Sequence, residues 1–375
     1  MSLRARLATA IDHQVRKTLR VPDAPASETR IKDVEVASPP NYTELAKSLS
    51  APAKEGPRGA ESMRVEYSMA YSWEYNVARV DLRALYEKSK DLMWNARALP
   101  WSTNVDPEAE NIPDNLNPLH GSAVWRKLDA AGKIPMLRRN IASYMLSNFL
   151  HGEQGALLAT AQIVNCVPSA DAKLYAAAQV MDEARHVEAY DRYLREKVEL
   201  VYPITTPLKQ LLDTILTDSR WDMKYLGMQI MVEGIALAAF GLIHQSSNEP
   251  LIREITERIM QDEARHVAFG VLSLKDVYRE MPENELRDRE EFIVESSRLM
   301  RDRFLGQDVW ARLGLPKREC EEASEKSEMM QLFRTLLFSK IVPNVKRLGL
   351  LTPRVRQGFA DLGVLHFEAL AEKEN

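Results

Sequence analysis

The segment Asp-Glu-Ala-Arg-His occurs twice in this chain, at 182–186 and again at 262–266. Within each copy the Glu and the His are three residues apart, so on a helix both side chains lie on one face. A further Glu, Glu153 or Glu233, precedes the Glu of each copy by 30 residues, among small and apolar residues. The two equivalent half-sets together contain Glu153, Glu183, His186, Glu233, Glu263 and His266.

Four carboxylates and two imidazoles in this arrangement predict a site for two metal ions. Carboxylates buried without partners would be very costly, whereas two divalent cations balance their charge. Ligands rich in oxygen, with one His per metal, suit iron or manganese better than zinc. We expect two iron ions, with manganese acceptable at one or both positions. The alternative is a chance repeat on solvated helix faces, which a single Glu-x-x-His would favour but two matched copies do not.

Two helical hairpins would position these residues. Pro168 lies 15 residues after Glu153 and 15 residues before Glu183. If the chain turns there between antiparallel helices, each rising about 1.5 Å per residue, the two carboxylates return to one level. Asn248 has the same place in the second half. Two such hairpins predict a four-helix bundle that carries all six ligands at one level.

The neighbours Asp182, Arg185, Asp262 and Arg265 recur with the motif. A His that binds a metal normally donates its free ring N–H to a carboxylate or a carbonyl group. We expect Asp182 and Asp262 to accept these hydrogen bonds across the bundle, each held by an Arg. The alternative is a weak Asp–Arg pair on the surface of each helix.

The rest of the chain predicts an all-α protein, because only 15 of its 375 residues are glycine and alternating β-type runs are nearly absent. Bundle helices are expected at about 134–166, 170–200, 208–245 and 250–280, and further helices at 283–313, 319–342 and 352–370. Residues 1–62 are expected to form a basic helix and then a proline-rich, largely disordered arm. Residues 63–375 are expected to form a single helical domain, with the metal-binding bundle at about 134–280 and accessory helices over 283–370.

Composition excludes several classes of function. A net charge of -4 makes nucleic acid a poor partner. Two cysteines, Cys166 and Cys320, exclude a disulfide framework and a four-thiolate iron–sulfur cluster, and they fit a reducing cytoplasm. No apolar run predicts a membrane span. No nicotinamide or flavin fingerprint is visible, so electrons must come from a separate donor such as a reductase or ferredoxin, or from the substrate.

The repeated segments, with Glu153 and Glu233 before them, resemble the ferritin-like di-iron carboxylate oxygenases, most closely the aminobenzoate N-oxygenase and benzoyl-CoA epoxidase type. The stretch "LYEKSKDLMWNARALPWSTNVDPE" is similar to the segment that leads into the bundle of such proteins. The resemblance covers roughly residues 70–280 and implies a ferritin-like fold. It also implies that Glu183 and Glu263 bridge the metals and that His186 and His266 cap one metal each. Glu153 and Glu233 would be terminal ligands that can shift during catalysis.

Three positions depart from related groups. Ile259 stands where the N-oxygenase group has an additional His, one turn before the last Glu-x-x-His. Leu237 stands where multicomponent monooxygenases usually have a Thr. Tyr190 occupies the position of the radical Tyr of ribonucleotide reductase subunits, and here we expect it to pack or to form a hydrogen bond, with a radical or pocket role as the alternative.

The predicted function is a di-iron, dioxygen-dependent oxidoreductase that oxygenates a small apolar or aromatic organic substrate. Space for dioxygen and substrate is expected beside the small residues Gly152, Gly155, Ala156, Gly234 and Ala236. The alternatives are an iron-handling or ferroxidase protein and a radical-generating, reductase-like subunit. A monomer or homodimer would favour the oxygenase, and a cage of many subunits would favour iron storage.

Overall fold

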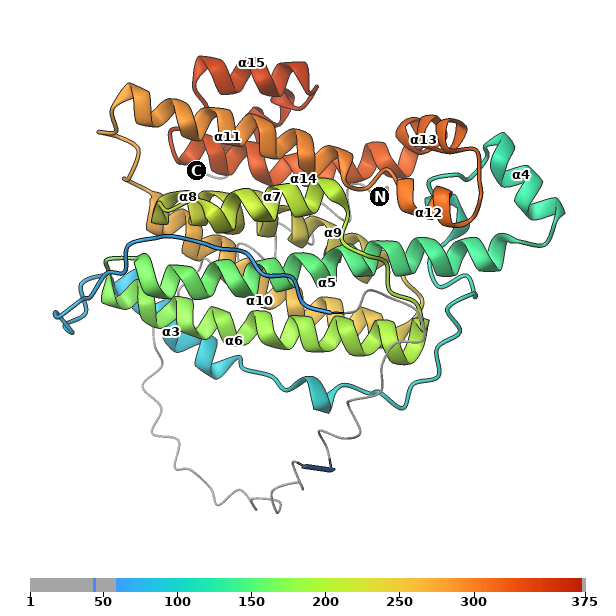
Figure 1. Ribbon diagram of the computed structural model, residues 1–375, viewed down its shortest axis with the longest axis horizontal. Coiled ribbons are helices and arrows are strands. Elements are labelled where there is room, and N and C mark those ends of the chain that lie inside the picture. Colours follow the sequence, from blue (N-terminus) through green and yellow to red (C-terminus); the bar gives the residue numbers. More distant parts are fainter. Residues whose placement is uncertain (1–42, 45–58, 373–375) are drawn as a thin grey trace.

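The computed structural model describes residues 43–44 and 59–372. Every regular element among these residues is a helix and none is a strand, which confirms the all-α prediction (Figure 1). The basic helix and arm predicted over 1–62 lie almost entirely outside the described residues, so they remain predictions.

Four long helices form the core: α5 (Ile134–Cys166), α6 (Ala170–Tyr193), α9 (Glu233–Ser246) and α10 (Pro250–Leu274). Helix α5 packs along α6, α9 packs along α10, and α6 contacts α10. The two predicted turns lie at Pro168 and Asn248. After each turn a side chain caps the new helix: Ser169 accepts a hydrogen bond from the backbone N–H of Ala172, and Glu249 accepts two from the start of α10. This is the ferritin-like arrangement that the repeated motif predicts.

The single helix predicted over 208–245 is wrong, because the chain bends before it enters the bundle. Helix α7 (Thr206–Thr217) packs on the outside of α5 and on α11, and α8 (Trp221–Tyr225) begins a new helical segment. At the bend, Asp218 accepts a hydrogen bond from the backbone N–H of Arg220 and also pairs with its guanidinium group. Such local side-chain bonds compete with helix continuation.

Two π-helical turns flank the metal-ligand level. One, η3 (Leu194–Val198), extends α6 and ends at Glu199, whose φ of 55° is left-handed. The other, η4 (Leu226–Val232), ends immediately before Glu233. Wider turns of this kind inside α-helices frequently occur at functional sites. Here the π-helical turn changes the helical register just before Glu233 and so helps to set the direction of its side chain.

The accessory helices are shorter than predicted. The ranges 283–313, 319–342 and 352–370 are each broken: at Gly306 (φ 78°), at Ser327, whose side chain caps the following helix, and at Gly363 (φ 73°). Helix α3 packs on α6 and α10, α14 packs on α9, and α11 packs on α15. Over residues 59–372 the accessory elements are α3 (Val80–Asp91), η1 (Ala96–Ala98), η2 (Asp114–Leu116), α4 (Ala123–Ala130), α11 (Glu283–Asp302), α12 (Gln307–Arg312), α13 (Lys317–Lys326), α14 (Glu328–Arg347), α15 (Pro353–Asp361) and η5 (Leu365–Glu372).

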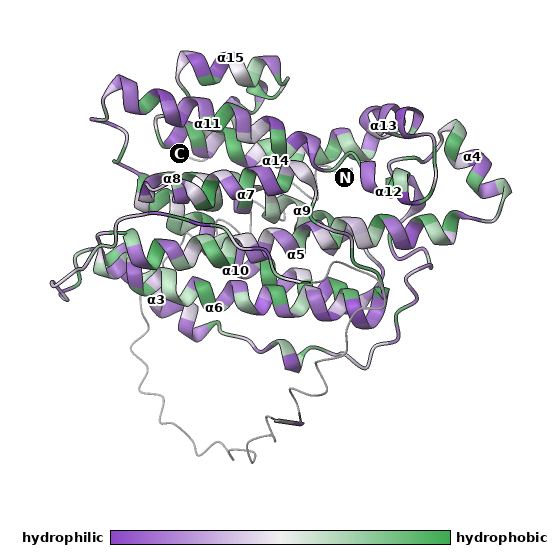
Figure 2. Cartoon of the chain, viewed as in Figure 1, coloured by the Kyte–Doolittle hydropathy of each residue, from purple (hydrophilic) through white to green (hydrophobic). Residues whose placement is uncertain are grey.

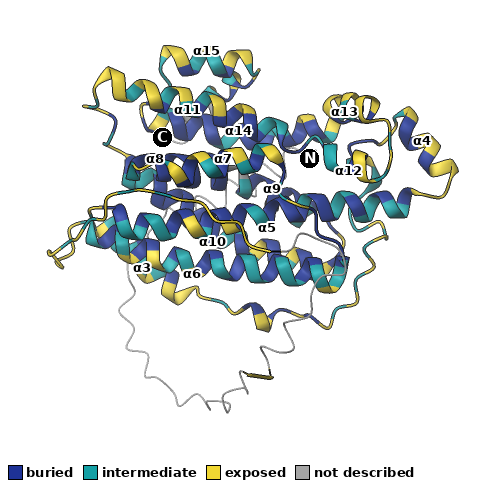
Figure 3. Ribbon diagram, in the orientation of Figure 1, coloured by how far each residue is buried: buried dark blue, intermediate teal, exposed yellow. Residues whose placement is uncertain are grey.

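Burial follows the helix faces. Figure 2 shows apolar and polar residues mixed along most helices, and Figure 3 shows that buried residues concentrate in the bundle while exposed ones gather on outer helices such as α13 and α15. One run, Trp221–Ser246, is long and apolar enough to cross a bilayer by composition alone. Because 94% of its most apolar window is buried inside the protein, this run is a core element of the bundle.

Candidate metal centre

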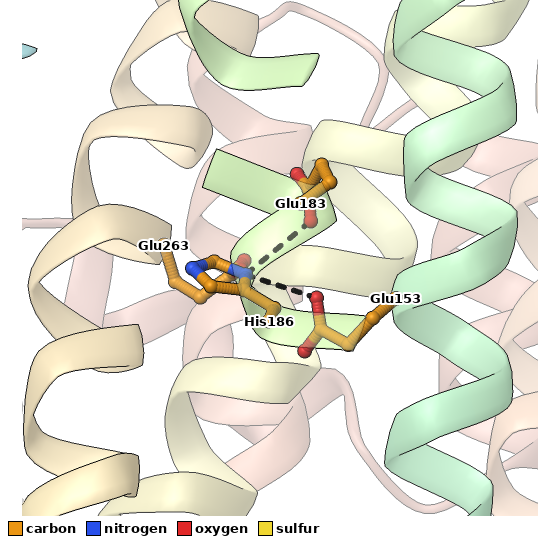
Figure 4. A group of neighbouring side chains, drawn as sticks. All are labelled: Glu153, Glu183, His186 and Glu263. Carbon is orange, nitrogen blue, oxygen red and sulfur yellow. Dashed lines mark hydrogen bonds and ion pairs between the residues drawn. The ribbon is translucent and has the colours of Figure 1, made fainter. Parts of the chain in front are cut away.

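The structure brings the six predicted ligands together in the middle of the bundle. The ligands form two groups that share one residue. Within each group, all ligand atoms lie within 4.8 Å of one another. In the first group, Nδ1 of His186 lies 3.1 Å from Glu153 Oε2 and 3.3 Å from Glu263 Oε1 (Figure 4). The members are Glu153, Glu183, His186 and Glu263 in the first group and Glu183, Glu233 and His266 in the second.

Glu183 belongs to both groups. Its Oε2 lies 3.4 Å from Nδ1 of His186, and its Oε1 lies 3.1 Å from Nδ1 of His266. Glu263 also approaches both rings, since its Oε1 is 3.5 Å from Nδ1 of His266 as well. The two carboxylates of the Glu-x-x-His motifs therefore lie between the two imidazoles, while Glu153 and Glu233 lie at opposite ends of the cluster.

The buried oxygens of this cluster fit a pair of cations. All six residues are at most 5% exposed. Among the described residues, one oxygen of Glu183, one of Glu233 and both of Glu263 have no hydrogen-bond partner. A carboxylate oxygen left in this condition is costly unless a cation binds it. The donor set and its orphaned oxygens can therefore hold two metal ions, as the sequence predicts.

Burial shifts the protonation of the cluster. It raises the pKa of Glu153 and of Glu233 well above the ordinary glutamate value. Burial alone would lower the pKa of the two histidines, but the surrounding carboxylates outweigh it and raise the pKa of His186 and His266 well above the ordinary value. The same histidines hold the pKa of Glu183 low against the effect of burial. Without metal, the cluster therefore keeps protons on its imidazoles.

Metal binding is expected to release protons. A metal needs a neutral imidazole, so the raised pKa of the histidines means that about two protons per chain must leave at neutral pH. Because the pKa of Glu153 and Glu233 is also raised, these carboxylates take up protons as the pH is lowered. Metal binding must then displace more protons, so the apparent metal affinity falls with the pH. Titration calorimetry of Fe(II) or Mn(II) in buffers of different ionisation enthalpy measures this number. A release of no protons at pH 7 would contradict the protonation scheme.

Behind the ligands, four charged side chains form a buried ring, here called the Asp–Arg quartet: Asp182, Arg185, Asp262 and Arg265. Each Asp pairs with the Arg of its own helix and with the Arg of the other helix. Each Asp also lies beside the His of the opposite hairpin: Asp262 Oδ2 is 3.0 Å from His186 Nε2, and Asp182 Oδ2 is 3.2 Å from His266 Nε2. These contacts can hold both rings with Nδ1 facing the carboxylates.

Two residues at this site were not found from the sequence. Trp94 donates a hydrogen bond from Nε1 to Asp262 Oδ2 at 2.7 Å, and its ring faces the Arg185 guanidinium. Gln179, fully buried, donates from Nε2 to Glu183 at 3.0 Å and to Glu233 at 2.8 Å. Gln179 lies one turn before Glu183 on the ligand face, which was an available indication. Its counterpart 80 residues later is the apolar Ile259, so the repeat gave no hint of it.

Tyr190 lies in an aromatic layer beside the cluster. It is fully buried, its ring contacts Phe149 and Phe240 at centroid distances of 5.9 and 5.8 Å, and Phe149 contacts Phe240 at 4.9 Å. Burial raises the pKa of Tyr190 well above its ordinary value. Its hydroxyl has no hydrogen-bond partner in the described part of the chain. Of the two expected roles, packing and hydrogen bonding, the structure therefore shows packing.

The predicted space beside the small residues is found at only some of them. A Cβ atom at Gly155 would lie 2.4 Å from Leu212, so this glycine allows α7 to approach and leaves no room. At Gly152 and Gly234, both buried, an added Cβ atom would meet nothing within 4 Å. Open space therefore lies next to Glu153 and next to Glu233, the two residues at the ends of the cluster.

The chain is similar to several known proteins. The family model of P-aminobenzoate N-oxygenase AurF matches residues 77–349. The dimanganese(II)-NrdF of Streptococcus sanguinis is 14% identical, with a TM-score of 0.49, over 78% of this chain and 99% of that chain. A tyrosine-to-phenylalanine variant of an R2-like ligand-binding oxidase with a Mn/Fe cofactor is 16% identical, with a TM-score of 0.49, over 73% of this chain and 94% of that chain. No curated protein sequence matches the chain.

Proposed function

The chain belongs to the P-aminobenzoate N-oxygenase AurF family, and on that premise we propose that it is a di-iron oxidoreductase that uses dioxygen to oxygenate a small apolar or aromatic organic substrate. The observation that carries the proposal is the convergence of four buried carboxylates and two imidazoles, with orphaned carboxylate oxygens between the rings. A bound pair of iron ions supplies redox chemistry toward dioxygen that amino-acid side chains lack. Manganese at one or both positions is the variation that this oxygen-rich ligand set allows.

The residues of the chain have separate tasks in this proposal. Glu183 and Glu263, which lie between the two imidazoles, would hold both ions, and His186 and His266 would each hold one of them. Glu153 and Glu233 are the terminal carboxylates, and the open space beside Gly152 and Gly234 lets them change position and lets small molecules approach. The Asp–Arg quartet positions the imidazoles, and the closed bundle excludes water from the cluster.

The ligand set contains no third imidazole among the described residues of the cluster. Ile259 is fully buried one turn before Glu263, where an additional His would have to stand. We therefore propose a site with six protein ligands and assign the chain to oxygenation in general, without choosing N-oxygenation. A separate reductase or ferredoxin as electron donor, a cytoplasmic location and a monomer or homodimer complete the proposal.

Oxygen reactivity tests the function directly. Protein loaded anaerobically with Fe(II) and mixed with dioxygen should show a transient visible absorption band and convert an arylamine, an aryl-CoA or a fatty acyl compound to an oxygenated product. No band and no product with any of these three classes would exclude the oxygenase. Native mass measurement adds a control, because a cage of many subunits would favour the iron-storage alternative over a monomer or dimer.

A further inference from the structure

A cavity of about 110 Å³ lies near the end of the bundle where α9 turns into α10. Its walls come from α5, η3, the end of α9 and the segment 107–117. A volume of this size is close to that of engineered protein cavities of roughly 150 Å³ that bind benzene. The cavity can therefore accept one aromatic ring or a short alkyl group.

The lining of this cavity favours an uncharged guest. Most of its surface is apolar, from residues such as Ile141, Met145, Leu242 and Ile252. Its polar side chains already have protein partners. These are Asn111, Asp114, Asn117, Arg138, Tyr193, Ser246 and Ser247. Since each of these side chains already has a protein partner, a charged ligand would have to compete with existing bonds or lose its hydration without full compensation.

One Arg fastens the segment that covers the cavity. Arg138 binds both carboxylate oxygens of Asp114, at 2.8 and 2.6 Å, and also donates to the backbone carbonyl of Glu108 at 3.4 Å. A second tie joins the backbone N–H of Asn248 to the carbonyl of Asn111 at 2.7 Å. These bonds tie the segment 107–117 to α5 and to the turn before α10.

Two helices, α5 and α6, run from the wall of the cavity to the metal ligands. Leu146 and Tyr193, both in its wall, are seven residues from Glu153 and His186, which corresponds to about 10 Å along a helix. The buried aromatic layer of Phe149, Tyr190 and Phe240 is placed between the two levels. The orphaned hydroxyl of Tyr190 in that layer is a polar group without a protein partner, which a passing molecule could satisfy.

We propose that this cavity binds the apolar end of the organic substrate, whose oxidised group reaches the metal centre about 10 Å away. The inference rests on the proposed function and narrows it to substrates with an uncharged tail, such as an alkyl chain or a second ring, attached to the group that is oxidised. A single small ring would fill either the cavity or the metal-centre side but could not reach both.

Binding of a neutral ring to the metal-free protein tests the cavity without any turnover. Fluorobenzene, followed by fluorine NMR, should bind the wild type, and fluorobenzoate should bind more weakly because its carboxylate finds no partner. Ala142→Trp fills the cavity and should weaken fluorobenzene binding at least about tenfold. Ala161→Trp is the matched control, since Ala142 and Ala161 are both half-buried residues of α5 and only Ala142 lines the cavity. Equal affinity in both variants, or no binding to the wild type, would overturn the proposal.

Substrate preference tests the link to the metal centre. Fe(II)-loaded wild type should oxidise p-hexylaniline with a kcat/KM at least about tenfold above that of aniline, and Ala142→Trp should lose this preference. An unchanged preference in Ala142→Trp would overturn the substrate role. A wild type that oxidises no arylamine, aryl-CoA or fatty acyl compound counts against the proposed function, and the fluorobenzene titration then decides the cavity separately. If Ala142→Trp fails to fold, Ala142→Leu fills the same space with a smaller side chain.

Discussion

Glu183→Ala is expected to bind less than one metal ion per chain and to lose oxygenation by at least about a thousandfold. Glu183 is the one residue that belongs to both ligand groups, with an oxygen 3.4 Å from Nδ1 of His186 and another 3.1 Å from Nδ1 of His266. Its removal therefore takes a ligand from each position at once. Metal content after dialysis, together with dioxygen uptake, measures the effect.

Two matched variants separate this expectation from general damage to the helix. Glu188→Ala changes a half-buried Glu of the same helix that lies outside the cluster, so it should keep both metals and full activity. Glu153→Ala removes a terminal residue from only one group and should keep one metal ion per chain. Two metal ions bound to Glu183→Ala would show that this carboxylate does not bridge the pair.

Asp262→Ala is expected to lower the free energy of unfolding of the metal-free protein by about 3–5 kcal/mol. The Asp262 carboxylate is 1% exposed and contacts Arg185, Arg265, His186 and Trp94. Without it, the Asp–Arg quartet has two guanidinium groups and one carboxylate, and a buried charge is left uncompensated. Because Asp262 also orients His186, metal affinity should fall by about 10–100-fold as well.

Urea unfolding of the metal-free protein and metal titration test the two parts of this prediction. Asp276→Ala is the control: Asp276 also pairs with an Arg, Arg279, but both side chains are more than half exposed, so the loss should stay below about 1 kcal/mol. Asp262→Asn keeps the volume and one acceptor and should fall between the two. A similar loss for Asp262→Ala and Asp276→Ala would mean that the quartet contributes nothing beyond a surface ion pair.

Much of the fold follows from rules of helix spacing and turn position that can be read directly from the sequence. The spacing of three residues inside Glu-x-x-His places both side chains on one helix face, and equal helix lengths about Pro168 and Asn248 bring Glu153 and Glu183, or Glu233 and Glu263, to one level. These relations depend only on helix geometry and turn positions. For this reason the all-α class, the paired hairpins and the capacity for two metal ions could be predicted before the structure was known.

Other features depend on local competition that composition does not reveal. The bend at Asp218–Arg220 interrupts a stretch whose apolar residues would suit a continuous helix, because side-chain bonds to the backbone outweigh helix continuation there. From the sequence, Gly155 could have lined an open space or allowed another helix to pack closely against it. The position of Leu212 shows that it allows close packing of α7. A small residue permits close approach without specifying what approaches.

The sequence by itself determined the all-α fold class and a candidate set of six metal ligands, because both follow from residue types that recur at helical spacing. Only the tertiary structure decided that Trp94 and Gln179 join the site and that Tyr190 packs without a hydrogen bond. These contacts join residues 54 to 168 positions apart. They depend on the rotation and register with which helices pack, which no spacing within one helix can specify.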